Sequence, residues 1–435
     1  MANDLLELRL DALAFGGDAV GRDDSGRVVF VPGGAPGDLV EARVTERKKA
    51  YARGELMRVV EPGARVTPAC PLASTCGGCP WMHVESATQL GAKEEIVRRA
   101  LAKSGAQVER ILPSPSWLGY RTRVRMTARS GAVGFQARKS HRVVDVPECP
   151  ALEPRLDRAV QAARHAIGPL LGDGGTLSGL LAADGRVHLA VTTCGERGTP
   201  ETLADAAAGL VGESQIVGVS VRSNDGKTSR YYGQPRLDVG EGFAASAAGF
   251  AQANAAQNQI LRKLVLRWAV PDEAAEPRVL ELYAGDGNFT RDLVKRARVV
   301  AVEGDREAAA RLVDNLRVVA PRTTPSDRGG SRTPVDTERW AVRAEPSAQA
   351  VRRLLEGAEQ FDVVVLDPPR AGAPDLVDEL PALGATRIVY ISCDPMTLAR
   401  DVARLAPHYR VVRAQPLDMM PHTSHIEVLC LLQRA

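Results

Sequence analysis

The first 60 residues alternate short apolar stretches with turn residues. Stretches of strand-like composition lie at residues 6–10, 27–32, 39–44 and 55–60, and glycines separate them. Each stretch is too short for a globular helix, and close spacing with glycine turns is typical of small antiparallel folds. The pattern therefore predicts a small β-barrel over residues 1–60.

The next part of the chain mixes helix and strand signals. Pro and Gly interrupt any periodicity from residue 61 to 79, and apolar residues at helical spacing return over residues 85–104. Residues 117–240 are rich in strand formers with helices between them. We expect a mixed α+β central domain over residues 61–240, in which a cysteine-bearing loop precedes a helix.

After residue 245 the pattern changes to buried strands that alternate with helices. The expected strands are residues 278–282, 299–303, 361–367, 387–392, 410–416 and 426–432. Such alternation predicts an α/β domain over residues 241–435, a Rossmann-like, doubly wound parallel sheet with helices on both faces. Residues 321–337, rich in Ser, Thr, Pro, Gly and Arg, read as a surface insertion.

Composition places the chain among ordinary globular proteins. It has 435 residues, of which 44% are hydrophobic and 25% charged, so wholesale disorder is excluded and about three domains are expected at roughly 150 residues each. No apolar run reaches the roughly 18 residues that a membrane span needs, and Asp4 and Glu7 stand where a secretory signal needs positive charge. We expect a cytoplasmic protein, without membrane contact and monomeric.

The net charge of +3 conceals a basic block. Residues 110–144 contain no Asp or Glu, but they contain Arg110, Arg121, Arg123, Arg125, Arg129, Arg138, Lys139 and Arg142. If residues 120–128 form a strand, Arg121, Arg123 and Arg125 share one face, which suits the phosphates of a nucleic acid. The alternative is a solvated face paired to acids elsewhere. A second basic cluster at residues 43–53 is diluted by glutamates, and either interpretation fits it.

Four of the seven cysteines have the spacing of a metal site. Cys70, Cys76 and Cys79 follow C-x5-C-x2-C, and Cys149 lies far downstream before a proline. Three close ligands and one remote ligand favour a [4Fe–4S] cluster over zinc, because zinc knuckles come as matched C-x2-C pairs. Zinc, or cysteines that bind no metal, remain the alternatives.

A strand, glycine turn and helix mark a nucleotide-type cofactor site. Gly285 and Gly287 follow the strand at 278–282, but Thr290 stands where a dinucleotide fingerprint needs its third glycine. The next strand ends at Glu303, where a carboxylate can accept hydrogen bonds from ribose hydroxyls. The incomplete glycine motif and Glu303 together favour S-adenosylmethionine over NAD, since S-adenosylmethionine has a ribose and no pyrophosphate. Glu281 could be a solvated strand-end residue.

Three later strands carry candidate chemistry at their ends. Asp367 opens Asp-Pro-Pro-Arg after one strand, and Cys393 stands in Ser-Cys-Asp-Pro after the next, with Asp394 as a predicted helix N-cap. Glu427 begins the last strand near the same crevice. The alternatives without a catalytic role are a small core residue for Cys393 and a surface carboxylate for Glu427.

Taken in order, these motifs resemble the RNA uracil-5 methyltransferases, and within them the 23S rRNA branch that has an N-terminal TRAM domain and an iron–sulfur cluster. The resemblance rests on residues 26–32, the four cysteines, and residues 120–123, 250–254, 282–289, 367–370, 392–395 and 425–427. It implies that Cys393 is the nucleophile and Glu427 the proton acceptor. It also implies contacts to the cofactor or the target base from Gln252, Tyr283, Asn288, Glu303, Glu345 and Asp367.

The implied reaction follows from uracil, whose C5 is too weak a nucleophile to take a methyl group directly. Addition of the Cys393 thiolate to C6 makes C5 electron-rich, and a base then removes the C5 proton so that the thiol can leave. We expect 23S rRNA as the substrate, with transfer RNA as an alternative. Asp-Pro-Pro could instead serve an amino-group methyltransferase, and an inactive iron–sulfur RNA-binding scaffold is the non-enzyme alternative.

Overall fold

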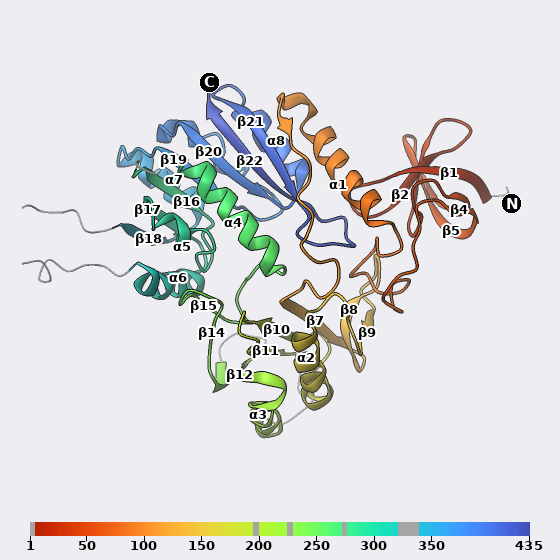
Figure 1. Ribbon diagram of the computed structural model, residues 1–435, viewed down its shortest axis with the longest axis horizontal. Coiled ribbons are helices and arrows are strands. Elements are labelled where there is room, and N and C mark those ends of the chain that lie inside the picture. The colour runs from red at the N-terminus through yellow and green to blue at the C-terminus, as the bar shows by residue number, and fades with distance from the viewer. Residues whose placement is uncertain (1–4, 195–199, 224–228, 272–275, 321–338) are drawn as a thin grey trace, which may run out of the picture.

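A closed five-stranded barrel forms the N-terminal part of the molecule (Figure 1). The structure is a computed structural model that describes residues 5–194, 200–223, 229–271, 276–320 and 339–435. The barrel strands are β1 (Leu5–Leu13), β2 (Ala19–Arg22), β3 (Val28–Val31), β4 (Leu39–Arg47) and β5 (Tyr51–Glu61), in the spatial order β1-β2-β3-β5-β4. The barrel prediction is confirmed. The sequence did not reveal β2, a four-residue strand whose Gly21 lies so close to the Arg9 carbonyl that a side chain would collide with it.

A helical connection lies between the barrel and the C-terminal sheet (Figure 1). The cysteine-bearing loop leads into α1 (Ser86–Ala100), which is followed by η1 (Ala102–Ser104) and the short strand β6 (Gln107–Val108). Helix α1 packs against β1 on one side and against α8 and β21 on the other. The apolar cores of the barrel and of one face of the C-terminal sheet therefore merge through α1 and the buried ring of Trp81.

The central region is a seven-stranded sheet in the order β13-β12-β11-β10-β7-β8-β9. Its elements are β7 (Arg123–Arg129), β8 (Ala132–Gln136), β9 (Val143–Asp145), α2 (Pro154–Ile167), η2 (Gly168–Leu170), β10 (Thr176–Leu181), β11 (Val187–Thr193), α3 (Pro200–Gly209), η3 (Glu213–Gln215), β12 (Ile216–Ser223) and β13 (Ser229–Gly233). Helices α2 and α3 cover one face and bury the apolar side chains of the strands. The other face is turned toward the C-terminal sheet across a cleft, and the pair β14 (Leu237–Asp238) and β15 (Ala244–Ala245) follows it.

The C-terminal region is an eight-stranded sheet in the order β18-β17-β16-β19-β20-β22-β21-β6. Its elements are α4 (Ala255–Ala269), β16 (Arg278–Leu282), α5 (Thr290–Leu293), β17 (Arg298–Glu303), α6 (Arg306–Val319), β18 (Trp340–Ala344), α7 (Ser347–Glu356), β19 (Val363–Leu366), η5 (Leu380–Leu383), β20 (Arg387–Ser392), α8 (Pro395–Leu405), β21 (Tyr409–Leu417) and β22 (Glu427–Arg434). Helices α4, α5 and α6 cover one face, and α1, α7 and α8 cover the other. The expectation of a doubly wound α/β domain is confirmed.

One part of that expectation needs correction. The strands from β18 to β20 are parallel, but β22 runs antiparallel to both β20 and β21. A long apolar strand reads the same in either direction, so its pattern cannot reveal its orientation. The predicted insertion at residues 321–337 lies outside the described residues. Among the helices that the structure describes, none has the length and apolar character of a membrane span.

Candidate active site

The register of the C-terminal sheet brings the predicted strand-end residues to one edge. Leu282 of β16 lies opposite both Val302 of β17 and Leu366 of β19. The residues that follow these three lie at the same edge of the sheet, where open α/β sheets bind ligands. They are Tyr283, Glu303 and Asp367.

The antiparallel direction of β22 adds Glu427 to this edge. Ser392 at the end of β20 lies opposite Val428, the second residue of β22. Cys393 and Glu427 are therefore next to each other in the continuation of this register, and facing side chains on neighbouring strands lie within roughly 5 Å at their Cβ atoms. A parallel β22 would have put Glu427 at the opposite end of the sheet.

Burial and neighbouring acids keep the thiol of Cys393 protonated. Burial first, and then the acids Glu427 and Asp367, raise its pKa to about 11 against the opposing effect of the Arg370 guanidinium. Burial and Asp367 also hold the pKa of Glu427 well above its ordinary value. Asp394 caps α8, as predicted, by accepting hydrogen bonds from the Met396 and Thr397 amides.

These residues line one large cleft between the central sheet and the C-terminal sheet. Its volume is about 1760 Å³, whereas a site for a single small ligand is typically about 300–1,000 Å³, so it can hold a cofactor and part of a second molecule together. The predicted site residues on its wall are Gln252, Tyr283, Asn288, Glu303, Asp367, Cys393 and Glu427. Glu345 is not part of this wall and instead forms an ion pair with Arg353. Its assignment to the cofactor stays a prediction.

The glycine turn and Glu303 fit a bound adenosine. Gly285 and Gly287 have φ values of 59° and 100°, and a side chain at Gly287 would collide with Leu312. The Glu303 carboxylate accepts one hydrogen bond from the Gly285 amide and one from the Asp305 amide, each 2.7 Å long. A carboxylate can accept about four hydrogen bonds, so it retains capacity for two ribose hydroxyls. Glu281, by contrast, is 1% exposed, which excludes the solvated interpretation of that residue.

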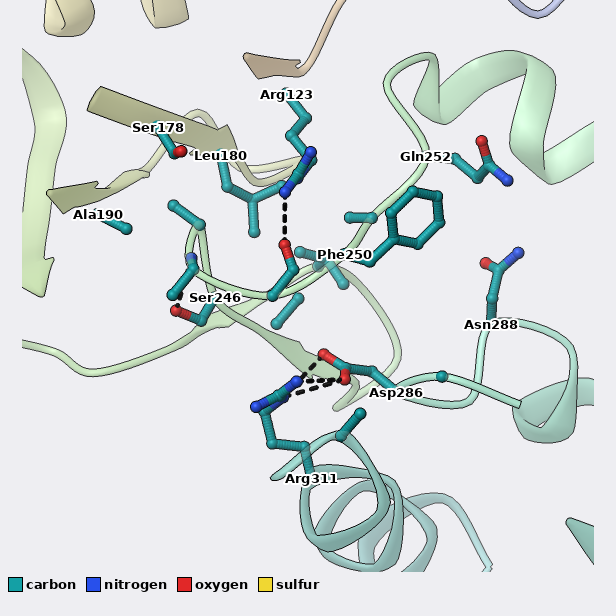
Figure 2. Close-up of a pocket in the computed structure, with 18 of the residues that line it drawn as sticks. Arg123, Ser178, Leu180, Ala190, Ser246, Phe250, Gln252, Asp286, Asn288 and Arg311 are labelled. Carbon is teal, nitrogen blue, oxygen red and sulfur yellow. Dashed lines mark hydrogen bonds and ion pairs between the residues drawn. The ribbon is translucent and has the colours of Figure 1, made fainter. Parts of the chain in front are cut away.

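Figure 2 shows the wall of the cleft, where Arg123 had been predicted to face phosphates, whereas Phe250, Asp286 and Arg311 had no predicted role. Arg123 donates a hydrogen bond of 2.6 Å to the Gly249 carbonyl, and its guanidinium lies 5.8 Å from the ring centre of Phe250. That ring is 68% exposed, which is unusual for a large apolar side chain inside a cleft. On the opposite wall Asp286 forms an ion pair of 2.9 Å with Arg311. Phe250 had a sequence signal, since it lies in the motif that contains Gln252.

Arg370 and His425 are two further residues beside the nucleophile. The Arg370 guanidinium lies 3.2 Å from Nδ1 of His425, and both side chains line the cleft. Burial, helped by the cations Arg370 and Lys93, lowers the pKa of His425 to about 4. The imidazole is therefore neutral at pH 7. The sequence placed both residues in motifs but gave no reason to pair them.

The four predicted ligand cysteines lie around a second, smaller cavity. Cys70, Cys76, Cys79 and Cys149 line it with apolar neighbours such as Phe135, and all four are free thiols. Within the described parts of the chain, no three His, Cys, Asp or Glu side chains converge closely enough to hold a single metal ion. A single ion draws its sulfurs to within about 2.3 Å of one point, whereas a four-iron cluster holds them around a larger cage. The four sulfurs that line this cavity are the donor set that a [4Fe–4S] cluster would use, and the cluster itself stays a prediction.

Arg121 has a different place from the one expected. Strand β7 begins at Arg123, so the predicted alternation holds for Arg123 and Arg125, while Val124 and Met126 are buried behind them. Arg121 precedes the strand and lines the cysteine cavity, with its guanidinium 5.7 Å from the ring centre of Phe135. The basic row facing the cleft is thus shorter than predicted, because the strand starts later than its pattern indicates.

The chain is similar in sequence to known protein families and to named RNA methyltransferases. Residues 343–435 match the tRNA (Uracil-5-)-methyltransferase family, and residues 4–57 match the TRAM domain. The 23S rRNA (uracil(1939)-C(5))-methyltransferase RlmD of Halomonas elongata is 36% identical, over 98% of this chain and 89% of its own. The protein of the same name from Vibrio parahaemolyticus is 31% identical, over 94% of this chain and 91% of its own.

A solved structure has the same fold. The Pyrococcus abyssi tRNA (uracil-54, C5)-methyltransferase in complex with S-adenosyl-L-homocysteine is 24% identical, matches with a TM-score of 0.70, and covers 98% of this chain and 100% of that one. The fold and the cleft define a class I methyltransferase with an N-terminal TRAM barrel. The identities over nearly the full length show that the chain belongs to the RNA uracil-5 methyltransferase family, which confirms the resemblance seen in the sequence.

Proposed function

We propose that this enzyme transfers the methyl group of S-adenosylmethionine to C5 of a uridine in 23S rRNA. The relatives named as 23S rRNA enzymes, with identities of 36% and 31%, support this RNA as the substrate. The observation that carries the chemistry is the pairing of β20 with β22, whose register continues to Cys393 opposite Glu427 on the wall of the cleft.

Cys393 is the nucleophile of the proposed reaction. The Cys393 thiol loses its proton to solvent, and the resulting thiolate bonds to C6 of uracil while the electrons of the C5–C6 double bond move onto the O4 side of the ring as an enolate. The cofactor supplies the methyl group to C5 and departs as S-adenosylhomocysteine. Glu427 then takes the C5 proton, the C5–C6 double bond forms again, and the bond between sulfur and C6 breaks. A buried carboxylate with a raised pKa is a stronger base than an exposed one, which suits this step.

The cofactor lies, in this proposal, along the glycine turn. Glu303 binds the ribose hydroxyls, and Gln252, Tyr283, Asn288 and Asp367 contact the cofactor or the target base. Two features support these roles. The Glu303 carboxylate can accept further hydrogen bonds, and the glycine turn allows a ligand to approach the backbone closely. Glu345, which forms an ion pair with Arg353, is the remaining proposed contact to the cofactor.

The wide cleft suits an RNA strand with one base turned out of its stack. Phe250 offers an exposed aromatic face beside the Arg123 guanidinium, and single-stranded bases stack on such faces. Arg125 is exposed on the same strand and faces the cleft, where it can bind a phosphate. The barrel carries the second basic cluster, and we assign it to flanking RNA.

The four cysteines hold a [4Fe–4S] cluster in this proposal. Such a cluster supplies a cross-link that ties residue 149 to residue 70, so its first role is structural. We also propose three domains, residues 1–60, 61–240 and 241–435, in a monomeric cytoplasmic protein.

The proposal is tested with the purified enzyme, labelled cofactor and transcripts of 23S rRNA and of tRNA. We expect 5-methyluridine in the 23S rRNA alone, mapped to one nucleotide by mass spectrometry. Methylation of tRNA alone would overturn the substrate, and methylation of an exocyclic amine would overturn the reaction. Deletion of the gene followed by mapping of the cellular rRNA is the matching test in the cell.

A further inference from the structure

A nine-residue connection delivers Glu427 to the active site. It runs from Asp418, directly after β21, to Ile426, directly before Glu427 at the start of β22. It also carries His425, which lies against Arg370 beside the nucleophile. The position of the Glu427 carboxylate therefore depends on how this connection is held.

Two buried polar side chains of α1 hold the connection. Gln89 and Lys93 are 0% exposed and lie one helical turn apart, so they share one face of α1. Lys93 Nζ donates to Asp418 Oδ1 at 2.5 Å and to the Met420 carbonyl at 3.0 Å. Buried Lys is rare unless it is paired, so these contacts fix the first turn of the connection to a helix more than 320 residues away in sequence.

Gln89 holds the next turn through His422. The His422 amide donates to Gln89 Oε1 at 3.0 Å, and Gln89 Nε2 lies 3.3 Å from His422 Nδ1. The same Nε2 group donates to the Trp81 and Val84 carbonyls, so Gln89 itself is fixed. The His422 carbonyl accepts a hydrogen bond of 2.9 Å from the Trp81 amide, two residues after Cys79.

The backbone of His422 needs this support. Its φ is 62°, in the left-handed region that costs a non-glycine residue about 1–3 kcal/mol unless its surroundings hold it. Its ring also lies against Trp117, with ring centres 5.3 Å apart. Loss of the contacts from Gln89 would free His422 to relax, and the chain between it and Glu427 is only four residues long.

We propose that Gln89 and Lys93 are positioning residues for Glu427, which hold the connection 418–426 so that its carboxylate reaches C5 of the bound uracil. The inference rests on the proposed function, in which Glu427 removes the C5 proton. It assigns a catalytic consequence to α1, which lies outside the cleft. Since Glu427 acts after sulfur has bonded to C6, its displacement stops the reaction with the RNA still attached to Cys393.

The test uses the full-length holoenzyme, a 23S rRNA transcript that it methylates, and denaturing gels that resolve the covalent protein–RNA adduct. In Gln89→Met, which keeps the side-chain length and removes every polar contact, we expect kcat to fall about 10–100-fold with little change in KM, because a small displacement of a catalytic group has effects of this size. We expect the adduct to rise at least about tenfold above wild type in the same samples. Arg99→Met, on the exposed surface of the same helix, is the control and should behave as wild type.

Glu427→Gln is measured in parallel. It distinguishes failure of the positioning role of Gln89 from failure of the base role of Glu427. If it traps the adduct but Gln89→Met loses activity without one, or keeps wild-type kcat, the positioning role is wrong and the proposed function stands. If neither traps an adduct, the base role of Glu427 fails, and the inference fails with it. Should Gln89→Met not fold, Lys93→Met combined with Asp418→Asn takes its place, since the pair is then removed without a stranded buried charge.

Discussion

The two sulfur sites of this molecule differ in the groups that raise the pKa of their thiols, which are carboxylates at Cys393 and other cysteines at Cys79. Burial raises the pKa of Cys393 and of Cys79 alike, to about 11 and about 12. At Cys393 the carboxylates of Glu427 and Asp367 contribute to the rise, and the Arg370 guanidinium opposes it. At Cys76 and Cys79 the Arg121 guanidinium acts in the opposite direction.

This difference matches two different uses of a thiolate. Cysteines that bind a cluster are always thiolates, so a cation beside them compensates their permanent negative charge. A nucleophile is needed as thiolate only while substrate is bound, and carboxylates that favour the thiol limit its reactivity between turnovers. Trp81 connects the cysteine cavity with the active site. It directly follows the cysteine loop, and its amide donates a hydrogen bond to the carbonyl of His422, which lies in the connection before Glu427.

Loss of the catalytic sulfur should have the largest effect. We expect Cys393→Ala to lower the methylation rate by at least about 10⁴-fold, since no other group can form the bond to C6. Calorimetric affinity for S-adenosylhomocysteine should be unchanged, because Cys393 lies away from the glycine turn. Appreciable methyl transfer by this variant would contradict the nucleophile role.

The pH dependence of Cys393 sharpens the comparison. With a pKa of about 11 in the free enzyme, the thiolate fraction grows roughly tenfold per pH unit over the range below it. Alkylation of the peptide that contains Cys393 by iodoacetamide should therefore speed up about 100-fold from pH 7 to pH 9. A rate that levels off below pH 8 would mean that Arg370 outweighs the carboxylates.

Removal of a cysteine from the second site should cost stability and iron. Cys149→Ser should lose the cluster and lower the melting temperature by roughly 5–10 °C, because the link between residues 70 and 149 is then broken. Anaerobically purified wild type should be brown and contain about four irons. Cys194→Ser is the matched control, since Cys194 is a free thiol that does not line this cavity. Stoichiometric zinc in the wild type would contradict the cluster.

The smallest effect is expected at the cleft wall. Arg125→Gln should weaken RNA binding about fivefold and reduce the salt dependence by about one counterion, because it removes one phosphate contact. Arg129→Gln alters the same strand outside the cleft, where Arg129 donates to the His141 carbonyl, and should leave binding unchanged. Equal losses in both variants would show a general charge effect.

Much of this architecture could be predicted because its signals are local. Strands β16 and β20 are rich in apolar residues and begin and end as expected, and the cap at Asp394 needs only residues 394–397. The errors in the prediction also arose from local sequence features. Strand β2 has four residues and one glycine, and the start of β7 was placed three residues early, which moved Arg121 from the cysteine cavity to the cleft in the prediction.

The sequence by itself determined the element types, the order of the motifs and the residues able to do the chemistry. Only the tertiary structure decided which of them meet. The antiparallel direction of β22 brings Glu427 to Cys393, and buried contacts across more than 320 residues join Lys93 and Gln89 to the connection before Glu427. Pairing direction and long-range contacts depend on how distant segments bury one another, and hydrophobic periodicity within one segment carries no information on its partner.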